Sequence, residues 1–303
     1  MRIISLFPAA TEMVCALGAA SSLVGISHDS DFPPELLTGI PRVTRTTLDE
    51  NAAPAEIDRL VRVSDSLGES LHVLDAEKIA DLEPDVIITQ GICDVCAIRE
   101  GDVRIIAESL RDPPIVLALS ADSLAEMLND IHRVAAAIER SPISEPLVDR
   151  LEARLSKVHH RLVAAAVPRP RVAVLEWTDP IYNAGHWVPQ MVRRAGGIEV
   201  LAKAGERSRK VTMDELVAAS ADTIIFAPCG YGVVRAAAEG EMQARKKEWA
   251  WLAERRVWAV DSGGLFSRPG PRLIEGVETL AEIFHPSVFP HPSRMRAVQL
   301  RIS

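Results

Sequence analysis

The stretch Ser144–Ala166, SEPLVDRLEARLSKVHHRLVAAA, decides the fold that we predict for this chain. Its apolar residues recur at spacings of three and four, with charged residues between them, at Leu147, Leu151, Leu155, Val158 and Leu162. This pattern predicts one continuous helix with a single apolar face, and Pro168 prevents the helix from continuing. A helix of roughly 23 residues is about 35 Å long, the width of a small domain. We therefore predict a strut that joins two lobes, and the alternative is a long helix packed on one sheet.

The segments on either side of this helix follow a similar order of elements. Arg2–Leu6 and Arg171–Leu175 both have the pattern of buried strands. In each half, an acidic helix start is followed by an aspartate, an apolar strand and a turn with a cysteine, in Glu77–Cys93 and Thr212–Cys229. Such a repeat favours two similar lobes, and Thr44–Ser70 has the character of an insertion. The predicted fold is an α/β protein of two Rossmann-like lobes with a ligand cleft between them, divided into residues 1–143, a connecting helix 144–168 and residues 169–303.

The composition excludes several classes of protein. With 303 residues, 48% of them hydrophobic, and a formal net charge of -8, the chain has no concentrated basic face for nucleic acid. It also lacks the run of about 18 apolar residues that a membrane-spanning helix needs. The N-terminus shows no secretory signal, so the sequence predicts a cytoplasmic location. Four cysteines are too few and too scattered for a disulfide scaffold.

The loops that follow the predicted strands are the expected place for a ligand. In open parallel sheets the carboxyl ends of the strands form the ligand crevice, so these loops should converge. They are Pro8–Thr11, Ser27–Phe32, Gln90–Cys96, Trp177–Trp187, Pro228–Tyr231 and Gly263–Arg272. The rings of Trp177, Tyr182 and Trp187 offer flat apolar faces to a large ligand, unless they only pack in the core. Because no nucleophile and base pair, phosphate loop or catalytic carboxylate pair is evident, we predict a binding protein without a required cofactor rather than an enzyme.

The Cys93-x-x-Cys96 pair admits two other interpretations. A lone pair is a weak zinc signal, because a structural zinc site needs four ligands. If Cys93, Cys96, Cys229 and His28 met in space, they could form a site for a metal or a metal chelate such as a siderophore or haem. The other interpretation is that the cysteines are buried and unreactive.

Four stretches carry a family resemblance. They are RIISLFPAATE at 2–12, VGISHDSDFPP at 24–34, LEPDVII at 82–88 and FSRPGPR at 266–272. As a set, and in this order, they resemble the cobalamin-binding proteins of ABC importers, which belong to the helical-backbone type of periplasmic binding protein. The resemblance implies two α/β lobes joined by one long helix, a corrinoid such as cobalamin as ligand and an ABC permease as partner. It also makes the periplasm or the cell surface the alternative location, if the family's usual export applies.

The resemblance also implies site residues. The family's ligand loops fall on Pro8, Ala9, Ala10, Thr11, His28, Asp29, Gln90, Gly185, His186, Phe266 and Arg268, beside the aromatic residues named above. Neutral imidazole is a common ligand for cobalt, so His28 or His186 is the candidate for that role. By position in the repeat, Glu77 and Asp214 are the permease-docking acids, with Glu215 as a possible substitute. As acids at helix starts they could instead only stabilise the helix dipoles.

Overall fold

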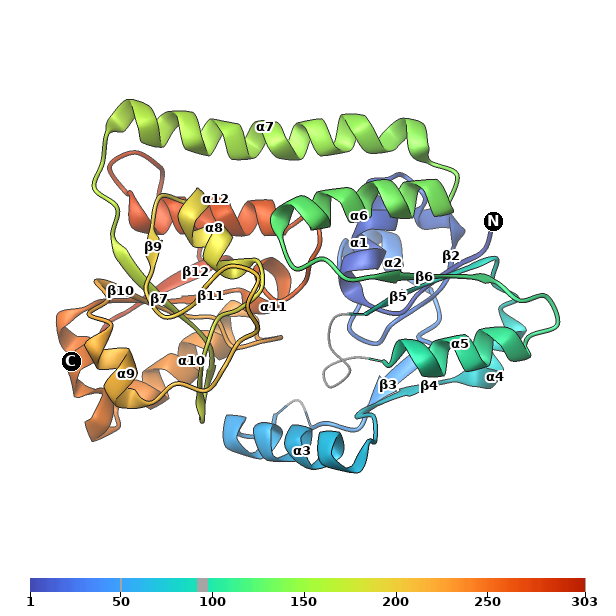
Figure 1. Ribbon diagram of the computed structural model, residues 1–303, viewed down its shortest axis with the longest axis horizontal. Coiled ribbons are helices and arrows are strands. Elements are labelled where there is room, and N and C mark those ends of the chain that lie inside the picture. Colours follow the sequence, from blue (N-terminus) through green and yellow to red (C-terminus); the bar gives the residue numbers. More distant parts are fainter. Residues whose placement is uncertain (50, 92–97, 303) are drawn as a thin grey trace. The chain divides into compact units, whose positions relative to one another are not determined.

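Figure 1 shows the protein as a computed structural model that describes residues 1–49, 51–91 and 98–302. The chain forms two compact units. Unit 1 comprises Met1–Ala121 and Ala125–Arg150, and unit 2 comprises Asp122–Leu124 and Leu151–Ser303. The predicted long helix is present as α7 (Ser141–Ala165), and the division between the units falls within it, after Arg150. The lobe boundaries predicted above stay a prediction, and the two units are described separately.

Unit 1 is built on a parallel sheet of four strands in the order β2-β1-β5-β6. The central strands are continuous apolar runs, since both of their faces are covered, and Ile4 lies beside Ile87 with neither exposed. The strands are β1 (Ile3–Ser5), β2 (Leu23–Ile26), β5 (Val86–Gln90) and β6 (Ile115–Leu119). The helices are α1 (Pro8–Ala16), α2 (Pro34–Leu37), α3 (Pro54–Leu67), α4 (Ala76–Asp81), α5 (Glu100–Ser109) and α6 (Leu124–Ala137), with a 3₁₀ turn at Ala20–Ser22.

The predicted insertion is a hairpin that carries a helix. Strands β3 (Thr44–Thr46) and β4 (His72–Leu74) pair in antiparallel fashion, and α3 lies in the connection between them (Figure 1). The helix was predicted within one residue, because its apolar residues have helical spacing and Gly68, in the left-handed region, ends it. The hairpin was not predicted.

Unit 2 is built on a mixed sheet in the order β12-β11-β10-β7-β8, with β9 also paired to β7. Strands β7, β9, β10 and β11 are parallel, whereas β8 and β12 run antiparallel to their neighbours. The strands are β7 (Arg171–Thr178), β8 (Ile181–Asn183), β9 (Ile198–Glu199), β10 (Thr223–Phe226), β11 (Arg256–Val260) and β12 (Ala297–Leu300). The helices are α8 (Val188–Arg194), α9 (Met213–Ala218), α10 (Val233–Ala244), α11 (Ser262–Leu265) and α12 (Leu273–Phe284), with a 3₁₀ segment at Lys247–Glu254.

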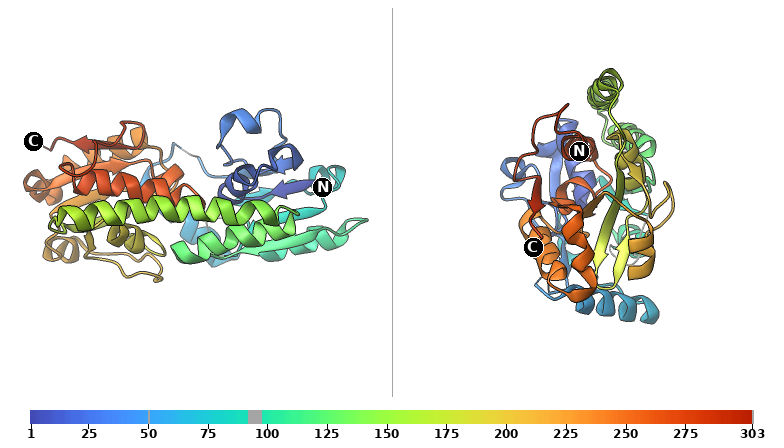
Figure 2. Two further views of the ribbon diagram at one scale, coloured as in Figure 1. Left: turned by 90° about the horizontal axis from the view of Figure 1, so that it is seen from above. Right: turned by 90° about the vertical axis from the view of Figure 1, so that its left-hand side faces the viewer.

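The second half of α7 packs on unit 2. It runs alongside α12 (Figure 2), and Arg154 donates two hydrogen bonds to the Glu278 carboxylate, at 2.9 and 2.6 Å. The predicted apolar face is confirmed, since Leu151, Leu155 and Val158 are buried. None of the helices in the described ranges is both long and apolar enough to cross a membrane.

The pseudo-repeat predicted from the sequence is present in both sheets. The order β2-β1-β5-β6 in unit 1 matches β9-β7-β10-β11 in unit 2. At the start of the paired strands, the backbone N–H of Arg2 donates to the Asp85 carboxylate at 2.6 Å. Arg171 donates to Asp222 in the same way at 2.9 Å. The aspartate before each apolar strand therefore bonds the start of the strand beside it, and the protein has the predicted two-lobe α/β fold.

Candidate functional site

In unit 1, hydroxyl groups join the loops that follow β1 and β2. The Thr11 hydroxyl lies 2.8 Å from Ser5 Oγ and 2.7 Å from Ser30 Oγ. Ser27 Oγ is 2.8 Å from the same Ser30 hydroxyl, and the Arg42 guanidinium donates to the backbone carbonyls of Ser27 and Ser30. These polar groups therefore hold the two loops together.

This arrangement limits which predicted ligand residues of unit 1 reach the surface. Ala9, Ala10 and Thr11 have no exposed surface, so their side chains belong to the core of the unit rather than to an open ligand face. Pro8, at the start of α1, and Gln90, at the end of β5, are partly exposed.

His28 is held against the β3–β4 hairpin. Its Nδ1 lies 2.6 Å from Thr44 Oγ1, and its ring is 5.2 Å from that of His72. The second ring nitrogen, Nε2, is buried and lies 3.4 Å from the carboxylate of Asp29. Asp29 is exposed, whereas the buried Nε2 of His28 is not open to a ligand in this structure.

In unit 2, the predicted convergence of the strand-end loops is confirmed. Ser262, after β11, donates its hydroxyl hydrogen to the carbonyl of Ala227, after β10, at 2.8 Å. Ser267 Oγ accepts the N–H of Gly230 at 3.2 Å. The Trp187 indole N–H donates to the Phe266 carbonyl at 2.7 Å, which ties the start of α8 to the same edge of the sheet.

A tight backbone arrangement at this edge positions His186. A Cβ on Gly185 would lie 2.4 Å from the backbone nitrogen of Ser208, so only glycine fits there. His186 has a φ of 53°, in the left-handed region that few non-glycine residues adopt. Its N–H donates to Glu206 at 2.7 Å, and its carbonyl accepts from Gly205 at 2.9 Å. The loop at 205–208 thus holds His186 in a costly conformation, as is common at functional sites.

The imidazole of His186 is oriented by a carboxylate. Nδ1 lies 2.7 Å from Asp122 Oδ1, within unit 2, and the ring lies 5.5 Å from that of Trp187. An ionised carboxylate only accepts hydrogen bonds, so Nδ1 is the donor and a neutral ring keeps its lone pair on Nε2. Within the described residues Nε2 has no hydrogen-bond partner. It is also not one of the buried side-chain atoms that lack a partner, so it has some exposed surface. A histidine bonded to a carboxylate in this way is suited to ligate a metal centre.

The aromatic residues of this edge differ in exposure. Trp177 and Tyr182 are cross-strand neighbours on β7 and β8, and both are partly exposed. The Trp177 ring meets Tyr231 edge-on at 5.5 Å, and Lys210 Nζ lies 5.7 Å from the centre of the Tyr182 ring. Trp177 and Tyr182 are thus the aromatic side chains from the predicted ligand set that a ligand can reach.

Trp187 and Phe266 have another role. They are only 6% and 3% exposed, and the Trp187 indole N–H finds its acceptor in the Phe266 backbone carbonyl. The prediction that the Trp187 ring serves as a ligand platform is therefore not supported by this structure, in which Trp187 and Phe266 are both buried. Arg268, in the loop between α11 and α12, is partly exposed and stays a candidate contact.

The cysteines do not form a recognisable metal centre in the described part of the chain. Cys93 and Cys96 lie outside the described residues. Elsewhere in the described ranges, no group of three or more His, Cys, Asp or Glu residues is arranged to hold a metal ion. Burial, with help from the nearby carboxylates of Glu12 and Glu35, raises the pKa of the half-buried Cys15 thiol to about 11. Cys229 is exposed, so the expectation of a buried thiol is wrong at that position.

The predicted docking acids occupy equivalent positions. Glu77 and Asp214 are each the second residue of a short helix, α4 and α9, and both are exposed. Glu215 is engaged differently, since its carboxylate accepts the Thr212 N–H at 2.8 Å and lies 3.0 Å from Arg209. Asp214 is therefore the more available acid of its pair.

Comparison with known proteins identifies the family. A family model described as periplasmic binding protein matches residues 3–250, which is most of the chain. The chain belongs to the periplasmic binding protein family. The vitamin B12-binding protein of Vibrio cholerae serotype O1 is 23% identical over 278 residues, which cover 91% of this chain and 86% of that protein. An uncharacterized ABC transporter substrate-binding lipoprotein of Bacillus subtilis, YvrC, is 25% identical over 302 residues, with coverage of 95% and 81%.

The fold has a close counterpart among solved structures. A periplasmic heme binding protein from Pseudomonas aeruginosa superposes with a TM-score of 0.71 at 20% identity, over 98% of this chain and 97% of that one. The predicted resemblance to substrate-binding proteins of ABC importers is thus confirmed. Members of this family carry a ligand rather than a resident cofactor. The alternative of a metal site built from Cys93, Cys96, Cys229 and His28 gains no support from these proteins.

Sequence reasoning missed Asp122, the residue that orients His186. Its position was a usable signal, because Asp122 follows the carboxyl end of the parallel strand β6, and loops at such strand ends form the ligand crevice. Nothing in the sequence, however, indicated that its carboxylate meets a histidine 64 positions away.

Proposed function

We propose that this chain is the substrate-binding component of an ABC-type uptake system, that it binds cobalamin or a related corrinoid, and that His186 is the ligand to cobalt. The observation that carries the proposal is the His186–Asp122 hydrogen bond of 2.7 Å, which leaves Nε2 open to a metal centre. The partly exposed rings of Trp177 and Tyr182, on the strands β7 and β8 that precede His186, suit the flat, largely apolar surface of a corrin. The B12-binding relative, which covers 91% of this chain, supports the choice of ligand.

The geometry favours His186 over His28 for this role. Both imidazoles bond through Nδ1, to Asp122 and Thr44 respectively. The Nε2 of His28 is buried beside Asp29, whereas that of His186 is open. We therefore expect His28 to support its loop rather than to reach cobalt.

Haem is the second candidate ligand. The Pseudomonas structure supports it, because that protein shares the fold at a TM-score of 0.71 and binds heme. Imidazole ligates iron as well as cobalt, so His186 would serve either macrocycle.

The deciding experiment is a titration of the purified full chain with aquocobalamin, cyanocobalamin and hemin, followed by tryptophan fluorescence and the visible spectrum. We expect saturable quenching near one corrinoid per chain. Because aquocobalamin has an exchangeable water on cobalt, its spectrum should also shift. Binding of hemin alone would favour the second candidate, and binding of none of the three would overturn the proposal.

Matched histidine variants test the ligand. His186→Ala should abolish the spectral shift of aquocobalamin, whereas His28→Ala should keep it. An unchanged shift in His186→Ala would refute the assignment of His186 while leaving corrinoid binding intact. Asp122→Asn should weaken binding by about 10- to 100-fold, since residues that orient a metal-ligating histidine have effects of that size.

The partner and location belong to the same proposal. Glu77 and Asp214, exposed at equivalent positions of two helices, are the proposed contacts with an ABC permease. Charge reversal of both should reduce uptake without changing the titration, whereas reversal of the engaged Glu215 mainly costs stability. An uptake component meets its ligand outside the cytoplasm, so the location that fits this proposal is the periplasm or the cell surface, and recovery of the chain in the cytoplasmic fraction on cell fractionation would contradict it.

A further inference from the structure

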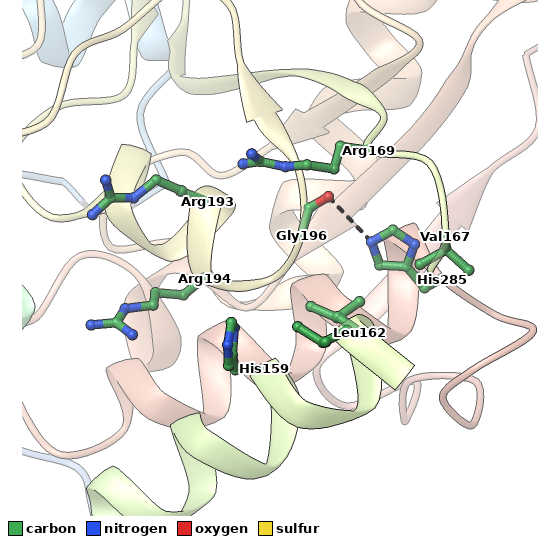
Figure 3. A pocket seen from close by; sticks show the side chains of 9 residues that line it. His159, Leu162, Val167, Arg169, Arg193, Arg194, Gly196 and His285 are labelled. Atoms are coloured by element: carbon green, nitrogen blue, oxygen red, sulfur yellow. Dashed lines mark hydrogen bonds between the residues drawn. The ribbon is translucent and has the colours of Figure 1, made fainter. Parts of the chain in front are cut away.

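A cavity of about 520 Å³ in unit 2 lies apart from the site described above (Figure 3). It is formed by the second half of α7, the segment before β7, the end of α8 and the end of α12. His186 lies two residues before the start of α8, whereas Arg193 and Arg194 lie in its last turn. The cavity therefore adjoins the amino end of β7, and the His186 site adjoins the carboxyl end of the same strand.

The lining of this cavity carries only positive or neutral groups. It includes Arg169, Arg193 and Arg194, together with His159 and His285, and none of the described residues that line it is acidic. In Figure 3 the three guanidinium groups extend to the same side. This concentration of positive charge is notable in a chain with a net charge of -8.

The guanidinium groups of these arginines have N–H donors that their hydrogen bonds in the described part of the chain do not use. Arg169 donates one bond, to the Gly197 carbonyl at 2.6 Å. Within the described residues, the guanidinium groups of Arg193 and Arg194 form no ion pair, and both side chains are exposed. Attraction to the negative end of the α8 dipole accounts for two arginines in the last turn. It does not account for Arg169, which comes from outside that helix.

Gly196 lines the cavity at a position where a larger residue would crowd its neighbours. Gly196 has a φ of 83°, and a Cβ there would lie 2.7 Å from His285 Nε2 and 3.0 Å from Leu162 Cδ1. His285 is buried and its Nε2 lies 3.3 Å from the Gly196 carbonyl oxygen. Burial lowers the pKa of His285, so its ring is neutral near pH 7 and the positive charge comes from the arginines.

We propose that this cavity binds a small organic anion that carries two or more phosphate or carboxylate groups. Guanidinium groups match both kinds of anion through paired N–H donors. A volume of about 520 Å³ falls in the range of small-molecule sites. The apolar side chains of Leu162, Val163 and Val167 give the carbon skeleton of such a ligand a surface to contact.

The test uses the full chain, calorimetric titration and two probes, inorganic pyrophosphate and citrate. Because each guanidinium group would donate charge-assisted hydrogen bonds to the anion, Arg193→Gln/Arg194→Gln should weaken binding by at least about tenfold. Tighter binding of pyrophosphate would assign a phosphate ligand, and tighter binding of citrate a polycarboxylate.

Arg245→Gln/Lys247→Gln is the matched control, because it removes two exposed positive charges of unit 2 that do not line the cavity. The control should bind the probes as the unchanged protein does. An equal loss in both variants would mean that only the net charge matters, and this would overturn the proposal, as would failure of both probes to bind at millimolar concentration. The corrinoid titration should be the same in all these variants, so this inference and the proposed function fail separately.

Discussion

Replacing Glu199 by Gln should change how the stability of the protein depends on pH. Glu199 lies in β9, beside β7, with its carboxylate turned toward backbone amides. Oε1 accepts the N–H groups of Val200 and Leu201 at 3.1 and 2.9 Å, and Oε2 accepts that of Val174 at 3.3 Å. These bonds favour the charged form, but burial outweighs them and raises the pKa of the Glu199 carboxyl from 4.5 to about 7.

The size and sign of the effect follow from this pKa. Between pH 4.5 and about 7 the unfolded chain has lost the proton and the folded chain has kept it. The free energy of unfolding therefore falls as the pH rises through this interval, and the contribution is gone above pH 7. At about 1.36 kcal/mol per pKa unit, the loss from this group is about 3 kcal/mol. Glutamine is neutral at every pH, so the free energy of unfolding of Glu199→Gln should not show this loss.

Urea unfolding of both proteins between pH 5 and pH 8 measures the effect. Across this range the free energy of unfolding of the unchanged protein should fall by about 2.5 kcal/mol relative to that of Glu199→Gln, because part of the full loss has already occurred at pH 5. Glu241→Gln, at an exposed carboxylate, is the control and should track the unchanged protein. A constant difference between Glu199→Gln and the unchanged protein would refute the reasoning. A trend of opposite sign would mean that the backbone N–H bonds outweigh burial.

Two further predictions concern the backbone and the long helix. Gly185→Ala should displace the 205–208 loop, because the new Cβ would lie 2.4 Å from the Ser208 nitrogen. We expect a lower melting temperature and at least about tenfold weaker corrinoid binding. An unchanged corrinoid titration would show that this loop does not position His186. Arg154→Ala and Glu278→Ala, alone and together, should give a coupling free energy of about 1 kcal/mol in urea unfolding, because the pair is doubly hydrogen-bonded but partly exposed. Strict additivity would show that the pair does not hold α7 to unit 2.

Local sequence patterns were enough to predict the helices and strands whose buried residues recur at regular spacings. The long helix α7 was predicted within three residues at each end, since its apolar face repeats over many turns and Pro168 follows it. The central strands and α12 were predicted for the same reason. The short strands β8, β9 and β12 were not predicted, because two to four residues hold too little pattern. They exist through pairing, as when Ala297–Leu300 adds to the edge of β11.

For the candidate site, too, some features were predictable from the sequence and others depended on the tertiary structure. The sequence alone determined that two similar α/β lobes flank one helix, and that polar and aromatic residues gather where the strands end, because these features depend on local periodicity and repeat order. It suggested His28 and His186 equally as metal ligands. Only the tertiary structure separated them, because whether a ring nitrogen is open depends on neighbours far away in the chain. Asp122, 64 positions from His186, orients one ring and leaves its Nε2 open, whereas the Nε2 of His28 is buried.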